Sequence, residues 1–214
     1  SYDELLPILL EKKFEYNGKT ISTVNELKQL TKDNRKSNSF WRQLYRYNAK
    51  TPKYNTIEEF SKGLNSTQST AVLTLNVITS HLEKELELLR SAKNIGIDVK
   101  YIELGNEVYA ENLLTKHIYP TVDNYIDTCI SWSKAILKEF PDAHIGVVGG
   151  DRNRRTRNWN EKLSSALERS FSQSKLNQFH FILHYYSHFK NPKYDFETSL
   201  GYKKLIAYPK VDLE

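Results

Sequence analysis

The stretch Lys100-Tyr-Ile-Glu-Leu-Gly-Asn-Glu107 decides how this chain is organised. Its apolar part predicts a short buried strand over residues 99–104, which ends at Gly105 because a glycine lets the backbone turn. Asn106 and Glu107 follow directly at the C-terminal end of that strand. An amide can hold a substrate hydroxyl and a carboxylate can transfer a proton, so the pair is a candidate for acid/base chemistry. An ordinary polar turn after a strand would have the same residue types.

Strand and helix patterns alternate on both sides of this stretch. Strands are expected over residues 71–77, 99–104, 144–148 and 179–183, with amphipathic helices between them. Repeated strand–helix units predict neighbouring parallel strands joined by right-handed crossovers. We therefore expect residues 55–214 to hold βα units and residues 1–54 to form an irregular, partly helical N-terminal segment. Within that segment, Asn17-Gly18 predicts a hairpin and residues 32–39 predict a loop.

Two α/β architectures have this pattern, the doubly wound sheet and the (β/α)8 (TIM) barrel. A dinucleotide-binding sheet would carry Gly-x-Gly-x-x-Gly after its first strand, and the sequence lacks that motif. Barrel enzymes build their sites from the C-terminal ends of several strands. Each predicted strand here ends in polar residues, namely Asn76, Asn106 with Glu107, Asp151, and His184 with Tyr186. A complete barrel needs about 250 residues, so we expect a partial barrel covering about strands three to six.

Composition sets further bounds on the chain's class. Lys and Arg number 31 against 26 acidic residues, a net charge of +5 that fits attraction to an anionic partner without requiring nucleic acid. No apolar run is long enough to span a bilayer and no signal peptide opens the chain, so we expect no membrane partner. The absence of methionine predicts a trimmed or partial chain. The single Cys129 excludes an internal disulfide and a cysteine-based metal site.

Three other clusters have a functional and a plainer interpretation. His180, His184 and His188 recur every fourth residue but span too far for one ion, so we expect no metal and no cofactor. The arginines of residues 152–157 could hold sulfate or carboxylate groups, or form a solvated loop. The aromatic and basic residues of segment 41–47 could stack on nucleic-acid bases, or pack as an aromatic face.

Four strand ends carry a resemblance to a known family. Glu103-Leu-Gly-Asn-Glu107, preceded by Tyr-Ile, resembles the acid/base motif of the retaining glycoside hydrolases on (β/α)8 barrels. The nearest members are the heparanase-like β-glucuronidases and the α-L-arabinofuranosidases. Leu75-Asn76 resembles the end of their third strand, Gly149–Arg155 the basic loop after their fifth, and His184-Tyr-Tyr186 the His-x-Tyr of their sixth. The similarity extends over about residues 55–190.

The resemblance implies hydrolysis, with retention, of O-glycosyl bonds in a polysaccharide or oligosaccharide, acidic ones included. Glu107 is expected to be the general acid/base and Asn106 to bind the sugar hydroxyl beside the reacting carbon. Tyr186 is expected to orient the nucleophile, while Asn76 and His184 line the pocket.

The family's nucleophile is a Glu at the end of a seventh strand. The chain reaches no such strand, and Glu214 lacks a strand pattern, so we expect a fragment without the nucleophile. Secreted or periplasmic location is favoured, and no nucleic-acid partner is expected. The alternative function is a carbohydrate-binding protein of the same fold that has lost catalysis.

Overall fold

The computed structural model describes residues 2–37, 40–42, 44–45, 56–110, 113–150 and 158–184. The chain divides into two compact units, Ser1–Leu183 and His184–Glu214. Of the second unit only His184 is described. The helices and strands named below therefore all belong to the first unit.

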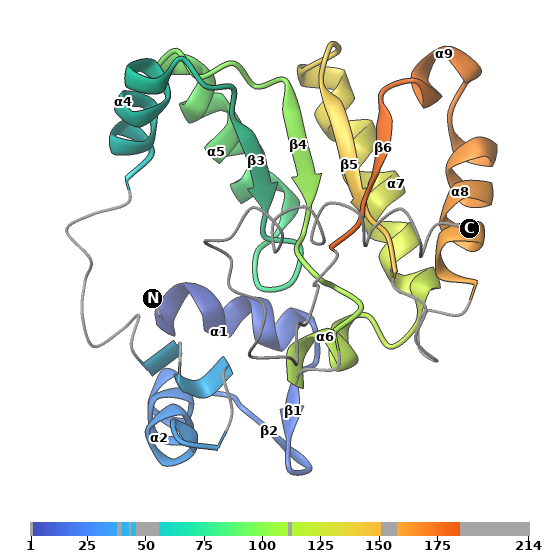
Figure 1. Cartoon of the computed structure of the whole chain (residues 1–214). Coiled ribbons are helices and arrows are strands. Elements are labelled where there is room, and N and C mark those ends of the chain that lie inside the picture. Colours follow the sequence, from blue (N-terminus) through green and yellow to red (C-terminus); the bar gives the residue numbers. More distant parts are fainter. Residues whose placement is uncertain are drawn as a thin grey trace, which may run out of the picture. The chain divides into compact units, whose positions relative to one another are not determined.

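A four-stranded parallel sheet forms the centre of this unit. Its strands are β3 (Val72–Leu75), β4 (Tyr101–Leu104), β5 (His144–Val148) and β6 (Phe179–Ile182). They lie in the order β3-β4-β5-β6, and each neighbouring pair is parallel (Figure 1). The predicted strands, their parallel pairing and their order are confirmed, and the molecule is an α/β protein.

Helices connect and flank the strands. They are α4 (Ile57–Thr67), α5 (Leu82–Asn94), α6 (Leu113–Ile118), α7 (Val122–Glu139), α8 (Trp159–Ser170) and the short α9 (Gln173–Leu176). Local sequence explains several ends. The Thr56 side chain accepts a hydrogen bond from the Glu59 N–H and so caps α4. Thr121 and Asn124 form a capping box at the start of α7. Gly96, two residues past α5, has φ +86°, the left-handed conformation in which glycine costs least.

One face of the sheet carries the core. Strand register puts Leu73, Ile102 and Ile145 on the same face, and all three are buried with the inner sides of α5, α7 and α8. In Figure 1, α5 and α7 run behind the sheet. On the opposite face Val72 is 57% exposed and Tyr101 37% exposed. Among the residues that the structure describes, helices therefore cover one face of the sheet and leave parts of the other open.

The N-terminal segment forms a second hydrophobic core, which also includes Leu114 of α6. Helix α1 (Tyr2–Glu11) and helix α2 (Val24–Asn34) flank a hairpin of β1 (Glu15–Tyr16) and β2 (Lys19–Thr20). Asn17 and Gly18 at its tip both have positive φ, as the predicted hairpin turn requires. The predicted loop 32–39 is wrong at its start because α2 continues to Asn34. A capping box of Thr23 and Glu26 begins that helix.

Trp41 is fully buried in this N-terminal core. Its ring is therefore not exposed for stacking on a nucleic-acid base. Arg46 and Tyr47 of the same segment lie outside the described residues. In the part of the chain that the structure covers, no helix is long and apolar enough to cross a membrane.

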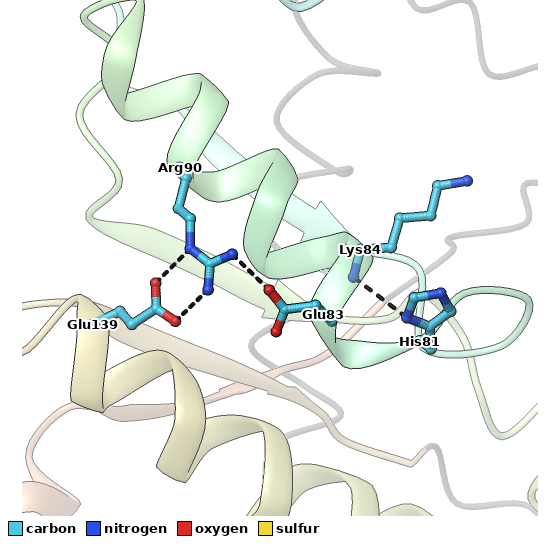
Figure 2. A network of polar contacts seen from close by, with 5 residues as sticks. All are labelled: His81, Glu83, Lys84, Arg90 and Glu139. Carbon is cyan, nitrogen blue, oxygen red and sulfur yellow. Dashed lines mark hydrogen bonds and ion pairs between the residues drawn. The ribbon is translucent and has the colours of Figure 1, made fainter.

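A polar network joins α5 to α7 on the outer surface (Figure 2). The Arg90 guanidinium donates to both carboxylate oxygens of Glu139, at 2.8 and 2.7 Å, and to Glu83 Oε1 at 2.7 Å. At the start of α5, His81 Nδ1 accepts a hydrogen bond of 3.4 Å from the Lys84 N–H. The bidentate pair connects two helices that cover the same face of the sheet.

Candidate functional site at the strand ends

The turn after β4 depends on Gly105. Its φ of +89° is a conformation that residues with a side chain rarely adopt. A Cβ at this position would lie 2.7 Å from Val77 Cγ2 and 2.8 Å from Val108 Cγ1, closer than real contacts allow. The turn leaves Asn106 exposed and Glu107 half-buried at the C-terminal edge of the sheet. The sequence prediction of a strand that ends at Gly105 is confirmed.

Glu107 itself has φ +46°, in the left-handed region. This conformation is uncommon for a residue with a Cβ and costs about 1–2 kcal/mol. Two features hold the residue there. Its carbonyl accepts a 2.7 Å hydrogen bond from the Ala110 N–H, and Val108, the next residue, is completely buried. The anchored chain that follows Glu107 thus holds its conformation.

Asn76 is the first residue after β3, as Gly105 is the first residue after β4. Since Leu75 pairs with Leu104, Asn76 comes at the same level as Gly105. Its Oδ1 accepts hydrogen bonds from the Ile78 and Thr79 N–H groups at 3.2 and 2.9 Å, and its Nδ2 donates to Thr79 Oγ1 at 2.7 Å.

The Asn76 side chain is exposed and organises its own turn. Its N–H donates to Glu85 Oε2 at 3.1 Å, so a buried carboxylate on α5 also fixes this strand end. The position of Asn76 in a substrate pocket stays a prediction.

Tyr125 links the ends of β4 and β5. Its hydroxyl donates to the Leu104 carbonyl at 2.7 Å and accepts from the Val148 N–H at 2.9 Å. Full burial raises the pKa of Tyr125 well above its usual value, so the hydroxyl stays a donor. Tyr125 lies on the buried side of α7, and the sequence analysis assigned it no role. Its place among the apolar positions of the helix could have indicated this role, because a buried tyrosine hydroxyl needs a hydrogen-bond partner.

Two more aromatic side chains hold strand ends in the same way. Tyr119 donates to the Val77 carbonyl at 2.7 Å, and Trp159 Nε1 donates to the Val148 carbonyl at 3.0 Å. With Tyr125 and Tyr109 they form a row of rings, at centroid distances of 5.5 Å (Tyr119–Tyr125), 5.8 Å (Tyr125–Trp159) and 6.5 Å (Tyr109–Trp159). Tyr109 comes two residues after Glu107. The candidate acid/base therefore lies two residues from this row of aromatic rings, which sequence reasoning missed.

Lys12 brings the N-terminal segment to the same edge of the sheet. Its ammonium donates to the Val77 carbonyl at 3.3 Å, and its own carbonyl contacts His117 Nε2 at 3.0 Å. Burial lowers the pKa of Lys12. Sequence reasoning missed this residue too, since its contacts are 65 and 105 positions away.

The end of β5 is held by α8. Asn160 Oδ1 accepts from the Gly150 N–H at 2.8 Å, and Asn160 Nδ2 donates to the Gly150 carbonyl at 3.2 Å. Asp151 and the arginines of residues 152–157 lie outside the described residues, as do Tyr186 and His188. His184 is half-buried and belongs to the second unit. The roles expected for His184 and Tyr186 stay predictions.

Neither a metal cluster nor a reactive thiol occurs among the described residues. Within those ranges, no group of three or more His, Cys, Asp or Glu side chains could hold a metal ion. Cys129 is completely buried on the inner side of α7, and burial raises the pKa of its thiol to about 12. Such a thiol is a poor nucleophile near neutral pH.

Comparison with protein-family models, curated proteins and solved structures finds no match for this chain. The chemistry of the strand ends is therefore the basis for assigning a function.

Proposed function

We propose that this chain is part of a retaining glycoside hydrolase on a (β/α)8 barrel, in which Glu107 is the general acid/base. The observation that carries the proposal is the left-handed backbone of Glu107, φ +46°, at the end of a buried parallel strand. Glycine or asparagine would fit this position at lower cost. Backbone strain that neighbouring contacts maintain is typical of functional positions, where a side chain must have one fixed direction.

The chemistry suits the position. A retaining glycosidase uses one carboxylic acid to protonate the leaving oxygen and a second carboxylate, about 5–5.5 Å away, to attack the anomeric carbon. Glu107 is half-buried at the strand end, and Asn106 beside it is exposed to hold a sugar hydroxyl. The second carboxylate would come from a later strand of the barrel, and Tyr186 would orient it.

The sheet supports a barrel over a doubly wound fold. A doubly wound sheet has helices on both faces, whereas a barrel sheet has them only outside. The face of this sheet away from α5 and α7 carries Thr74, which donates to Glu103 Oε2 at 3.0 Å, and the exposed Tyr101. Under the proposal, further strands on both sides of β3–β6 close over this face.

The test is the variant Glu107→Gln in the full-length protein. It keeps the shape of the side chain but removes the transferable proton, so hydrolysis of an unactivated oligosaccharide should fall about 10²–10⁴-fold. Saccharide binding, measured by calorimetry, should stay within a few-fold of wild type. Glu87→Gln, an exposed position on α5, is the matched control and should keep full activity. A Glu107→Gln enzyme with an unchanged rate would exclude the proposed role.

A further inference from the structure

Two histidines face one another on the open side of the sheet. His144 begins β5 and His180 is the second residue of β6. His144 Nδ1 and His180 Nε2 are 2.8 Å apart, and the ring planes differ by 25°. His180 is exposed and His144 half-buried. His144 lies at the N-terminal end of its strand, away from Glu107, so the proposed hydrolase site does not use this pair.

Strand pairing holds the two rings together. His180 is the register partner of Gly146, which has no side chain, and Gly146 is two residues from His144 on the same face. The Ile182 side chain packs over Gly146, and the His180 ring lies toward His144. The ring of Tyr101 on β4 lies 5.5 Å from that of His144 on its other side. The pairing of β5 with β6 thus sets the backbone positions of both histidines, and no loop has to be ordered to bring them together.

The distance between the nitrogens suits a particular kind of ligand. Imidazole nitrogen binds Zn²⁺, Cu²⁺ and Ni²⁺, at a metal–nitrogen distance of about 2.0–2.1 Å for zinc. At such a distance, two nitrogens that subtend a right angle at the metal are about 2.9 Å apart, and tetrahedral ones about 3.3 Å. The observed 2.8 Å is the hydrogen-bond distance of the metal-free pair, and it is also close to the right-angled value. Cu²⁺ and Ni²⁺ prefer the square-planar or tetragonal coordination that has this angle.

We propose that His144 and His180 form a two-histidine binding site for Cu²⁺ or Ni²⁺, with solvent as the remaining ligands. In the metal-free pair, one ring nitrogen donates its proton to the other. To bind an ion through both nitrogens, the donor ring changes tautomer: its proton leaves this nitrogen for water, and the other ring nitrogen takes up a proton from water, so both imidazoles stay neutral. A rotation of the two rings then turns both lone pairs toward the ion. The exposure of His180 leaves room for this rotation and for water ligands. The inference does not rest on the proposed hydrolase: in a closed barrel both histidines would face the interior, so the test uses the chain described here.

The test is titration of the tag-free chain with Cu²⁺ at neutral pH, by calorimetry and by electron paramagnetic resonance. Wild type should bind one ion at this site, with nitrogen hyperfine splitting from two imidazoles. His144→Gln and His180→Gln should each weaken that binding by about 10–100-fold or more and remove the two-nitrogen signal. His81→Gln removes an exposed histidine elsewhere and is the matched control, which should bind as wild type does.

A second measurement keeps the result interpretable if a variant folds poorly. Cu²⁺ should raise the melting temperature of wild type and His81→Gln, because a ligand of the folded state stabilises it, and should not do so for the two site variants. Circular dichroism of each metal-free variant checks its fold. Equal Cu²⁺ affinity in all four proteins, or a two-nitrogen signal that survives in His180→Gln, would overturn the proposal.

Discussion

Gly105 and Glu107 both have positive φ, but for different reasons. At Gly105, Val77 and Val108 leave no room for a side chain, so only glycine fits. At Glu107 a side chain is present although the backbone conformation disfavours it. The sequence predicted the turn and the candidate acid. It could not predict the strained backbone, because that depends on how residues 108–110 are anchored after the turn.

Substitution of Glu107 should separate stability from function. Glu107→Gly relieves the left-handed strain and should be more stable than Glu107→Gln by about 1 kcal/mol in urea unfolding. Gln68, the left-handed residue after α4 with φ +53°, provides the calibration, since Gln68→Gly should gain a similar amount. If Glu107→Gly is instead clearly less stable than Glu107→Gln, the side chain at position 107 has a structural role that does not need its charge.

Loss of the Tyr125 hydroxyl should weaken the strand ends directly. Tyr125→Phe leaves the Leu104 carbonyl and the Val148 N–H without this partner in the core, and we expect a loss of about 1–3 kcal/mol in the free energy of unfolding. Tyr101→Phe is the control because that side chain is 37% exposed, and it should change little. Equal effects of the two variants would contradict the bridging role.

Cys129 predicts a loss of stability in alkali. Burial raises the pKa of its thiol from 9.0 to about 12 in the folded state, so the unfolded chain loses this proton first. The contribution is fully present below pH 9 and is lost as the pH rises toward 12. The contribution of Lys12 has the opposite sign. Its pKa is lowered in the folded state, so its contribution to stability rises as the pH approaches 10.5. Urea midpoints between pH 8 and 11 should fall less steeply for Cys129→Ala than for wild type, and identical slopes would contradict this assignment.

At the level of elements, the apolar pattern predicted which strands and helices exist, and their order, better than it predicted where each begins and ends. The four parallel strands agree with the sequence analysis, and α7 is amphipathic as expected, with Tyr125, Cys129, Trp132 and Ile136 buried. Strand β4 begins at Tyr101, two residues later than expected. The apolar pattern indicates which residues are buried. Val99 is buried but is not paired with a neighbouring strand, so the pattern placed the start of β4 too early. The loop expected from residue 32 is wrong at its start because α2 continues to Asn34, whose side-chain Nδ2 donates to the Leu30 carbonyl.

The Arg90 network predicts a salt-sensitive contact between α5 and α7. Arg90→Ala should lower the urea midpoint slightly at low ionic strength, and the difference from wild type should shrink in about 1 M NaCl, because exposed charges are screened. Arg90→Lys keeps the charge but cannot make the bidentate contact to Glu139, so it should fall between the two. A loss that salt leaves unchanged would indicate lost packing rather than lost charge.

At the scale of the whole molecule, long-range contacts set the limit of prediction. The positions of Lys12 at the end of β3 and of Trp159 at the end of β5 depend on the packing of whole elements, which no local pattern reports. The row of aromatic rings at the strand ends could not be predicted either, because it also depends on how whole elements pack. The polar strand ends were readable because they directly follow the apolar strands in the sequence.

The leaving-group dependence of Glu107→Gln in the full-length protein tests the central claim most directly. A general acid matters most when the departing oxygen is strongly basic. The variant should therefore lose about 10²–10⁴-fold in the rate of glycosidic cleavage for an alkyl or sugar leaving group, and far less for a nitrophenyl leaving group. Azide should then accelerate the second step and give a glycosyl azide. Equal losses for both kinds of substrate would show that Glu107 does not donate the proton.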